Sequence, residues 1–373
     1  MTTDAGSEDD ARYMEASIAL GRQGLGRTAP NPAVGSIVVR DGIIVGRGVT
    51  RPGGRPHAET EALADAGAAA RGATLYVSLE PCSHYGRTPP CALAIVEAGV
   101  ARVVSALQDP DPRVAGRGHA MLREAGVAVT EGVCAESARR ANLGHILRVT
   151  EGRPMVTLKL AETADGFAAG DSHDPRLMIT GLEVANRVHM LRAAHDAVMV
   201  GVETALADDP LMTVRLPGLE DRKPLRIVLD TRLRLSPRSR VAQTARDVPA
   251  LVLAGEGAPE AAQRALEAAG VEVQRVAAAP DGRIDLRQAL AMLARRGLTR
   301  VFSEGGPQVA ARLVADDLAD EVVLFTSPRP LAREGVPALA EAARGRLADP
   351  ARYRAVEDVR VGVDRLRRWE RTH

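Results

Sequence analysis

Two series of short apolar segments alternate with helix-forming segments along the chain, and a break separates the two series. The first series has the strand-like segments AVGSIVV, IIVGRGV, ATLYVSL and ARVVSAL, with the helix-forming segments HAETEALADAGAAA and CALAIVEAG among them. The pattern stops around GHILRVTEGRP, residues 144–154, and MVTLKLA begins a second series that continues with DAVMVG, PLRIVLD, ALVLAG, TRVFSEGG and EVVLFTS. Helices between strands predict an α/β layer arrangement on each side of the break.

The length of 373 residues exceeds what one hydrophobic core usually supports. We therefore expect two α/β domains, residues 1–147 and residues 148–373. Near the start of the first, Asp41-Gly42 separates two apolar segments, and this dipeptide favours the two-residue turn of a β-hairpin.

Composition disfavours several classes of partner. Lysine plus arginine (49) nearly equals aspartate plus glutamate (48), and aromatic residues make up only 2% of the chain, so we expect no nucleic acid partner. No uninterrupted apolar run approaches the roughly 18 residues of a membrane span, so we expect no membrane association. Three cysteines and an acidic first segment, in place of a secretory signal, favour a cytoplasmic location.

The stretch EPCSHYGRTPPC holds Cys82 and Cys91, and the upstream triplet HAE holds His57 and Glu59. A catalytic zinc ion needs three protein ligands and one open position for water. HAE and the two loop cysteines meet that number, with Cys91 at a helix start where backbone amides favour a thiolate. Of His57 and Glu59, one can bind the metal while the other reaches over the open position to move protons. The alternative is a structural zinc or two ordinary buried thiols. A structural site normally has four protein ligands, however, and the third cysteine, Cys134, lies far downstream in EGVCAES.

These motifs resemble those of the cytidine deaminase-type zinc hydrolases, in which a glutamate that does not bind zinc is the general acid/base. With APNPAVG upstream and QDPDPRVAGRG downstream, about residues 10–145 resemble the deaminase half of the bifunctional riboflavin-biosynthesis deaminase/reductase. The resemblance implies a three-layer cytidine deaminase-like domain that holds one Zn²⁺ per chain through His57, Cys82 and Cys91, with Glu59 catalytic. It also implies that Asn31 and the SHYGRTPP loop shape the pyrimidine pocket.

Three stretches characterise the second half: MVTLKLAETADG, LRAAHDAVMVGVETALADDPLMTVR and VFSEGGPQVAARLV. Glycines between a strand and a helix let backbone amides approach a phosphate, although such turns are often simple connections. Together the stretches make about residues 153–365 resemble the reductase half of the same enzyme. The resemblance implies a dihydrofolate reductase-like α/β domain that uses NADPH.

The resemblance assigns residues position by position. It implies a part in the reduction site for Lys159, which could otherwise be an ordinary surface lysine. The implied NADPH contacts are Ala161, Met178, Thr204, Asp208, Thr231, Gly306, Pro307, Gln308, Val309, Ala310, Ala311 and Arg312. The implied substrate contacts are Arg176, Arg192, Met212, Arg215 and Glu304. Guanidinium groups suit a phosphate and a carboxylate can accept bonds from sugar hydroxyls, although the same residues could be exposed charges.

One segment departs from the family pattern. Where the family usually has Ser-x-Trp-Ile-Thr, this chain has Arg176-Leu177-Met178-Ile179-Thr180. A flexible thioether therefore replaces the flat surface of tryptophan at Met178, and a long cation replaces serine at Arg176.

The resemblance implies zinc-dependent deamination of a diaminopyrimidinone ribosylamino phosphate, followed by NADPH-dependent reduction of its ribosyl chain to ribityl. The expected partners are small phosphorylated pyrimidines, and the family favours a homodimer or larger assembly. Two alternatives remain. One is a nucleic-acid or nucleoside deaminase with an accessory nucleotide-binding domain, which for nucleic acid would need a basic surface with aromatic residues. The other is a zinc-stabilised scaffold protein.

Overall fold

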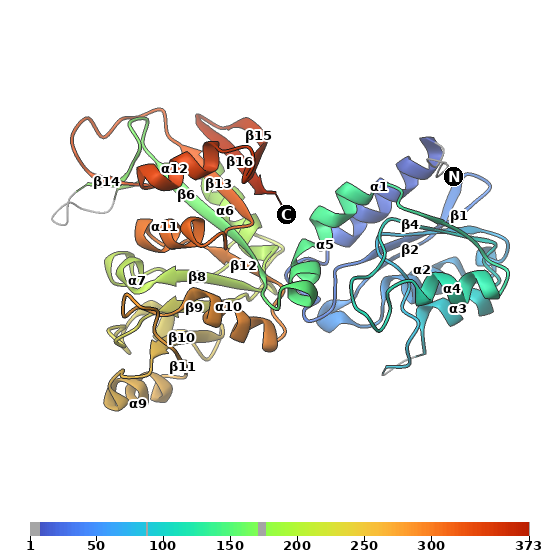
Figure 1. The fold of residues 1–373 in the computed structure, drawn as a ribbon, viewed down its shortest axis with the longest axis horizontal. Helices are drawn as coiled ribbons and strands as arrows, with labels where there is room; N and C mark the ends of the chain where they lie inside the picture. The colour runs from blue at the N-terminus through green and yellow to red at the C-terminus, as the bar shows by residue number, and fades with distance from the viewer. Residues whose placement is uncertain (1–7, 87–88, 171–176, 373) are drawn as a thin grey trace. The chain divides into compact units, whose positions relative to one another are not determined.

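The computed structural model describes residues 8–86, 89–170 and 177–372. The chain divides into two compact units, Met1–Gly152 and Arg153–His373, drawn from blue to green and from green to red in Figure 1. Helix α5 (Ala135–Thr150) continues through the border expected at residues 147 and 148, and the first unit ends shortly after this helix.

The first unit contains a five-stranded sheet in the order β2-β1-β3-β4-β5. Its strands are β1 (Gly35–Arg40), β2 (Ile43–Val49), β3 (Thr74–Val77), β4 (Arg102–Ser105) and β5 (Ala128–Glu131). Strands β1 and β2 form the hairpin that Asp41-Gly42 predicts, and both turn residues have the positive φ angles that such a turn requires, 51° and 76°. Strands β3, β4 and β5 are parallel, so their carboxyl ends meet at one edge.

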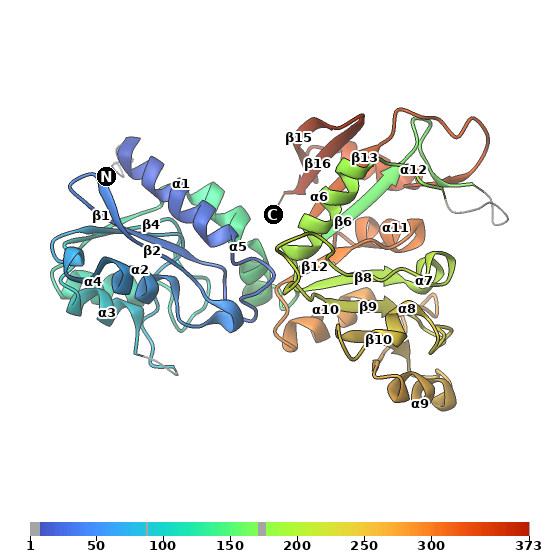
Figure 2. The same cartoon turned by 180° about the vertical axis from the view of Figure 1, so that it is seen from behind.

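Side chains alternate between the two faces of this sheet, and helices pack on both faces, so the unit has three layers. Ile37 and Tyr76 face one side, where they pack in a core with residues of α1 (Glu8–Arg22) and α5. Val38 and Leu75 face the other side, toward α2 (Ala58–Ala66), α3 (Cys91–Glu97) and α4 (Arg117–Glu124). Two short 3₁₀ helices, η1 (Pro52–Gly54) and η2 (Gly67–Ala70), flank α2. Figures 1 and 2 show the helices on the two faces of this sheet.

Two glycines of β2 let α2 lie directly on the sheet. A Cβ atom added to Gly48 would lie 2.0 Å from the carbonyl oxygen of Ala58, and one added to Gly46 would lie 2.3 Å from that of Ala62. Side chains at these two positions would therefore push α2 away from β2. The start of α2, where the HAE triplet lies, depends on this close contact.

The second unit contains a nine-stranded sheet in the order β11-β10-β9-β8-β12-β6-β13-β16-β15. The strands are β6 (Met155–Glu162), β8 (Ala197–Gly201), β9 (Leu225–Leu229), β10 (Ala250–Gly255), β11 (Glu272–Val276), β12 (Arg300–Ser303), β13 (Glu321–Thr326), β15 (Tyr353–Val361) and β16 (Asp364–Arg371). Neighbours from β11 through β13 are parallel, and β16 and β15 complete the sheet as an antiparallel hairpin. A small separate sheet pairs β7 (Phe167–Ala169) with β14 (Val336–Pro337).

Helices cover both faces of the large sheet. One core contains residues of α10 (Leu286–Arg295), α11 (Pro307–Ala315) and α12 (Glu341–Ala348). The core on the opposite face contains residues of α6 (Leu182–Ala193), α7 (Val202–Asp208), α8 (Arg240–Gln243) and α9 (Glu260–Ala268). The mixed α/β class expected for both halves of the chain is confirmed (Figures 1 and 2).

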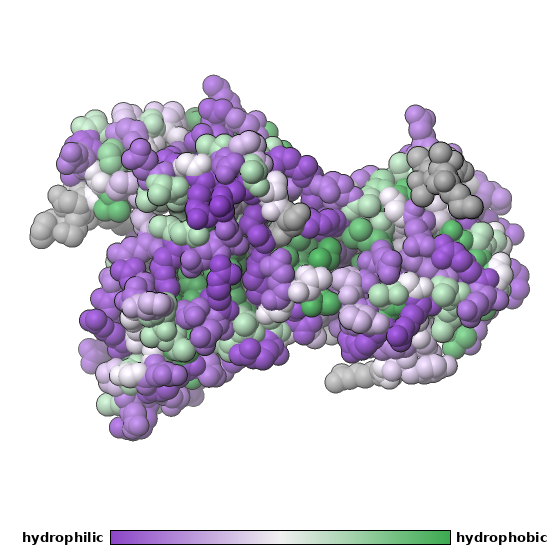
Figure 3. Space-filling view, viewed as in Figure 1, coloured by the Kyte–Doolittle hydropathy of each residue, from purple (hydrophilic) through white to green (hydrophobic). Residues whose placement is uncertain are grey.

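The surface of each unit is largely polar on the face drawn in Figure 3, where hydrophilic residues predominate. None of the helices within the described residues combines the length and the apolar character that a membrane crossing needs.

Candidate functional site

The start of α2 places His57 and Glu59 together. His57 is the N-cap residue, and its carbonyl oxygen accepts hydrogen bonds from the hydroxyl of Thr60 (2.8 Å) and the backbone N–H of Glu61 (3.2 Å). Glu59 lies in the first turn and is buried, with 4% of its surface exposed. The imidazole and a buried carboxylate thus leave the same helix end.

The cysteine loop begins beyond the carboxyl end of β3 and ends where α3 starts. The backbone N–H of Cys91, the first residue of α3, donates a hydrogen bond to Sγ of Cys82 at 3.3 Å. The next backbone N–H, of Ala92, donates to the carbonyl oxygen of Cys82 at 3.2 Å. These two bonds close the loop and bring the two thiols together.

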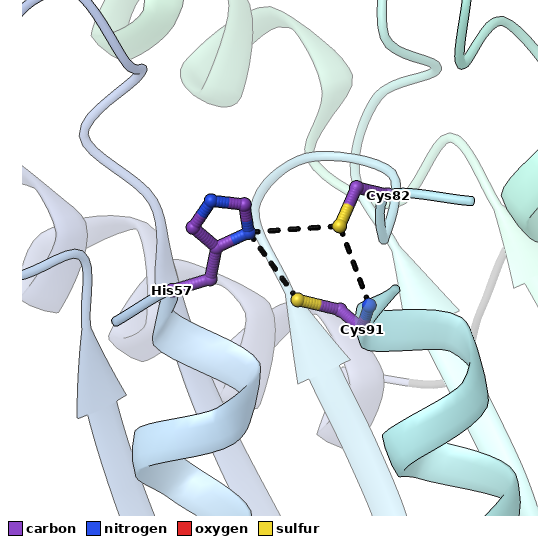
Figure 4. A group of neighbouring side chains, drawn as sticks. All are labelled: His57, Cys82 and Cys91. Atoms are coloured by element: carbon purple, nitrogen blue, oxygen red, sulfur yellow. Dashed lines mark hydrogen bonds between the residues drawn. The ribbon is translucent and has the colours of Figure 1, made fainter. Parts of the chain in front are cut away.

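The two cysteines and His57 form one compact group (Figure 4). Nδ1 of His57 lies 3.6 Å from Sγ of Cys82 and 3.3 Å from Sγ of Cys91, and all three ligand atoms lie within 4.8 Å of one another. Within residues 8–86, 89–170 and 177–372, no other group of three histidine, cysteine or acidic residues meets this distance. Cys134 is elsewhere, with its sulfur 3.7 Å from the carbonyl oxygen of Ala11.

The surroundings favour a thiolate on Cys82. The hydrogen bond from the Cys91 thiol lowers the pKa of Cys82 to about 4, with further help from His57 and from the backbone N–H of Cys91. The same thiol pair, together with burial, raises the pKa of Cys91. The sequence predicted that the start of α3 would stabilise a thiolate on Cys91. The amide there points instead at Cys82, where it adds to the larger effect of the Cys91 thiol in favouring a thiolate on that sulfur.

Glu59 is in the protonation range that proton transfer requires. Burial, and then the charge of Cys82, raise the pKa of Glu59 to about 7, against the opposing effect of His57. A carboxyl group with a pKa near neutrality can both accept and donate a proton. Glu59 lies beside the three-residue group and can therefore serve it as an acid or a base.

These three side chains fit a zinc ion in number and in chemistry. Two sulfurs and one imidazole nitrogen are the donor atoms that zinc accepts, and three protein ligands leave a fourth tetrahedral position open. A second thiolate beside Cys82 is unfavourable in the isolated pair, as the raised pKa of Cys91 records. A bound dication would remove that repulsion.

Asn31 supports the chain segment that leads to His57. Its side-chain amide donates a 2.7 Å hydrogen bond to the carbonyl oxygen of Gly54. Gly54 has a φ of 86°, and a Cβ there would lie 2.6 Å from the amide nitrogen of Asn31. Asn31 thus holds the segment before the zinc-ligand candidate. In the SHYGRTPP loop Tyr85 is 76% exposed, and residues 87–88 lie outside the described part of the chain.

In the second unit, expected cofactor residues gather where parallel strands end. Ala161 lies near the end of β6, Thr231 follows β9, and Thr204 and Asp208 lie on α7 directly after β8. The expected segment 306–312 forms the N-cap and first turns of α11, which follows β12. In open α/β sheets, ligands bind at the carboxyl ends of the strands.

Glycines keep side chains out of this edge. A Cβ on Gly306 would lie 2.9 Å from the hydroxyl oxygen of Thr204, and one on Gly201 would lie 2.9 Å from Cγ2 of Val309. The start of α7 and the start of α11 therefore approach each other closely. Helix N-termini with glycine nearby can present backbone N–H groups to a phosphate. This arrangement fits a phosphorylated cofactor such as NADPH, with Ala310 contributing only backbone because its side chain is buried in the core.

Arg192 and Glu304 form a buried ion pair. Nε and Nη2 of Arg192 donate to the two carboxylate oxygens of Glu304 at 2.5 and 2.9 Å, and Nη1 donates to the carbonyl oxygen of Thr213 at 2.9 Å. Burial would raise the pKa of Glu304, but Arg192 holds it below its ordinary value, and Lys159 of β6 and His189 add to that effect. All three nitrogens of the Arg192 guanidinium are thus hydrogen-bonded to protein groups.

Arg215 is the more open of the two arginines expected at the substrate. Its Nη1 donates to the hydroxyl oxygen of Thr213 at 3.2 Å, and its backbone N–H donates to Nδ1 of His189 at 3.2 Å. Burial, and then the charges of Arg192 and Arg240, lower the pKa of Arg215 against the opposing charge of Glu304. Met212 precedes this group with its side chain buried, 1% exposed, so only its backbone is available to a ligand.

The segment that departs from the family pattern is only partly described. Met178 is 71% exposed, and its carbonyl oxygen accepts a 3.4 Å hydrogen bond from Arg329. Arg176 lies outside the described residues.

Two residues with a place in these sites were not singled out from the sequence. His189 precedes Arg192 by one turn of α6, a spacing that puts both on one face of the helix and could have signalled it. Glu80 stands directly before Pro81-Cys82 and receives four backbone hydrogen bonds. An acid at that position carries no pattern that separates it from a surface residue.

Comparison with known proteins supports the domain family expected for each half of the chain. Residues 7–107 match the family described as the cytidine and deoxycytidylate deaminase zinc-binding region, and residues 154–340 match the RibD C-terminal domain. The riboflavin biosynthesis protein RibD of Aquifex aeolicus is 39% identical over 322 residues, 86% of this chain and 88% of that protein. The protein of the same name from Escherichia coli is 36% identical over 368 residues, 95% of this chain and 97% of that protein.

Solved structures agree with this result over nearly the whole chain. Acinetobacter baumannii RibD, form 1, is 32% identical with a TM-score of 0.85, covering 98% of this chain and 99% of that one. A diaminohydroxyphosphoribosylaminopyrimidine deaminase/5-amino-6-(5-phosphoribosylamino)uracil reductase from Thermotoga maritima is 33% identical with a TM-score of 0.82, at the same coverage. The chain therefore belongs to the RibD family of riboflavin biosynthesis, bifunctional enzymes that join a zinc-binding deaminase domain to a reductase domain.

Proposed function

We propose that the first unit deaminates 2,5-diamino-6-(5-phosphoribosylamino)pyrimidin-4(3H)-one at a single zinc ion held by His57, Cys82 and Cys91. The observation that carries this proposal is the convergence of the three ligand atoms within 4.8 Å beside a buried glutamate. When bound, zinc lowers the pKa of a water molecule so that it can attack carbon near neutral pH. The amine-bearing C2 carbon of the substrate is the point of attack.

Glu59 is the proton carrier of this reaction. It takes the proton that the attacking water loses and returns a proton to the amine that leaves as ammonia. Burial raises the pKa of Glu59 above its ordinary value, which favours the protonated form that returns the proton. Asn31 holds the segment before His57 through Gly54 and forms part of the pyrimidine pocket with the SHYGRTPP loop.

We propose further that the second unit uses NADPH to reduce the ribosyl chain of 5-amino-6-(5-phosphoribosylamino)uracil to ribityl. When bound, NADPH supplies the hydride that this reduction needs. The glycine-lined starts of α7 and α11 hold its phosphates, with contacts to the implied set Ala161, Met178, Thr204, Asp208, Thr231 and residues 306–312. No protein nucleophile is required, since positioning and charge suffice.

The substrate of the reductase lies near the ion pair of Arg192 and Glu304. Glu304 accepts hydrogen bonds from the sugar hydroxyls, and Lys159, whose charge acts on Glu304, lies at the reduction site. Arg215 is the principal phosphate ligand because less of its guanidinium is committed to protein groups than that of Arg192. Arg176 and Met178 complete the expected set. The working assembly is a homodimer or larger, with no nucleic acid partner and a cytoplasmic location.

The nucleic-acid or nucleoside deaminase alternative is not favoured. The second half of the chain matches the reductase domain of its family, and an accessory nucleotide-binding domain would not require that match. Ammonia release from the pyrimidine substrate would exclude a scaffold protein.

Replacing Cys82 with serine should remove zinc and deamination together, because a neutral hydroxyl is a poor substitute for a thiolate ligand. Reduction of the deaminated substrate should persist. Zinc content by atomic emission and ammonia release measure the two losses. Cys134→Ser is the matched control, and it should retain about one zinc per chain. Loss of zinc from Cys134→Ser with retention in Cys82→Ser would refute the ligand set.

Glu59→Gln should keep the zinc but slow deamination by about 10²- to 10⁴-fold, because a carboxamide cannot carry the proton. Steady-state ammonia release and zinc content test this. Glu61→Gln, on the same helix and paired with the exposed Arg51, is the control and should leave deamination and zinc content unchanged. Near-normal deamination by Glu59→Gln would assign Glu59 a structural role.

Arg215→Ala should raise the reductase KM for its phosphorylated substrate about tenfold or more, with little change in kcat, because charge-assisted hydrogen bonds contribute about 1.5–3 kcal/mol. Arg192→Ala should lower kcat as well, since it leaves the buried Glu304 without its cation. NADPH oxidation at varied substrate concentration separates the two effects. Arg264→Ala, an exposed arginine of α9, serves as control. If Arg215→Ala changes neither constant and Arg192→Ala changes KM alone, then Arg192, and not Arg215, is the phosphate ligand.

A further inference from the structure

Glu80 is a buried carboxylate to which the proposed reaction gives no role. Its side chain is fully buried, and both of its oxygens accept hydrogen bonds from backbone N–H groups. Oε2 accepts from Asp109 (3.1 Å) and Gly116 (2.9 Å), and Oε1 accepts from Gly118 (2.9 Å) and His119 (3.3 Å). An ionised carboxylate has about four acceptor positions and no donor, so these four bonds use its full capacity.

All four donors belong to one segment, residues 109–119, which includes most of the motif QDPDPRVAGRG. All four donors are backbone N–H groups, so the segment needs an acceptor at this place whatever its side chains are. Backbone N–H groups buried without an acceptor are costly, and removal of the carboxylate would leave several in that condition. Glu80 therefore binds this segment through four backbone contacts, beside the contact of Asp109 with His145.

The same segment also packs closely against Pro81, the residue between Glu80 and Cys82. A Cβ on Gly118 would lie 2.0 Å from the carbonyl oxygen of Pro81 and 3.2 Å from Oε1 of Glu80. The backbone N–H of Glu80 donates in turn to the carbonyl oxygen of Leu107 at 2.8 Å. Glu80 is thus held through both its side chain and its backbone N–H, and Pro81 is held by its close contact with Gly118. The proline ring further restricts the backbone before Cys82.

We propose that Glu80 is a positioning residue of the deaminase centre. By binding the 109–119 segment it fixes Pro81, and through Pro81 it sets the direction in which the Cys82 sulfur meets His57 and Cys91. This inference rests on the proposed zinc ligands, because it concerns the geometry that one of them presents. Groups that hold metal ligands in place typically change metal affinity by about 10- to 100-fold when they are replaced.

The test uses the full-length enzyme loaded with Co²⁺ in place of zinc, because cobalt absorption reports the geometry of thiolate ligands. Glu80→Gln keeps the size of the side chain, but its amide nitrogen cannot accept the two hydrogen bonds made to one of the oxygens. We expect a shifted cobalt–thiolate absorption band and Co²⁺ affinity about 10- to 100-fold lower in competition with a chelator. Gly118→Ala disturbs the same contact from the opposite side and should give the same changes, while NADPH oxidation on the deaminated substrate stays normal.

Asp10→Asn is the matched control for a merely structural effect. Asp10 is a buried carboxylate of the same unit that accepts hydrogen bonds from Tyr76 (2.7 Å) and Arg102 (2.9 and 2.7 Å) on the α1 face of the sheet. It should lower the melting temperature and leave the cobalt spectrum as in the wild type. Wild-type spectra and affinities in both Glu80→Gln and Gly118→Ala would overturn the inference alone, as would a shifted spectrum in Asp10→Asn. A wild-type enzyme that binds no Co²⁺ would refute the metal site itself, and the inference with it.

Discussion

The hydrogen bond from the backbone N–H of Cys91 to the sulfur of Cys82 is the contact on which the deaminase centre depends. It joins the loop after β3 to the first turn of α3, so that two thiols separated in sequence meet at one helix end. The amide adds to the larger effect of the Cys91 thiol, and both lower the pKa of Cys82 and favour a thiolate there. His57 completes the group from the start of α2, which Gly46 and Gly48 let lie directly on β2. Two sulfurs and an imidazole this close are best stabilised by a cation, and the family supplies its identity as zinc.

The second unit also brings together residues from separate elements, but it does so with a buried ion pair. Its candidate residues also follow the carboxyl ends of parallel strands, but the polar centre is a buried ion pair of Arg192 and Glu304. A buried pair often gives little net stability, since desolvation offsets the attraction between the charges. Its value here is positional: the same guanidinium also binds the carbonyl oxygen of Thr213, so Arg192 of α6 joins the residue after β12 to the segment that holds Thr213. Arg215 is more exposed than Arg192.

Local signals in the sequence predicted most elements of the fold. The Asp41-Gly42 hairpin and the core strands were evident because turn chemistry and apolar runs act over a few residues. The hairpin β15–β16 was not predicted, because its strands are rich in charge and are held partly by cross-strand pairs such as Arg365 with Asp358. Glu80 escaped notice for a similar reason. Its four partners lie 29 to 39 residues away, and no local pattern records such contacts.

One measurement tests the central claim, that a single chain carries two chemically separate centres. Ammonia release and NADPH oxidation are followed on the same preparation before and after zinc is removed with a chelator, with the diaminopyrimidine and the deaminated substrate supplied in turn. The account predicts that metal removal abolishes ammonia release and the NADPH oxidation that depends on it, while oxidation with the deaminated substrate continues. Loss of NADPH oxidation with the deaminated substrate after metal removal, or ammonia release that survives metal removal, would contradict it.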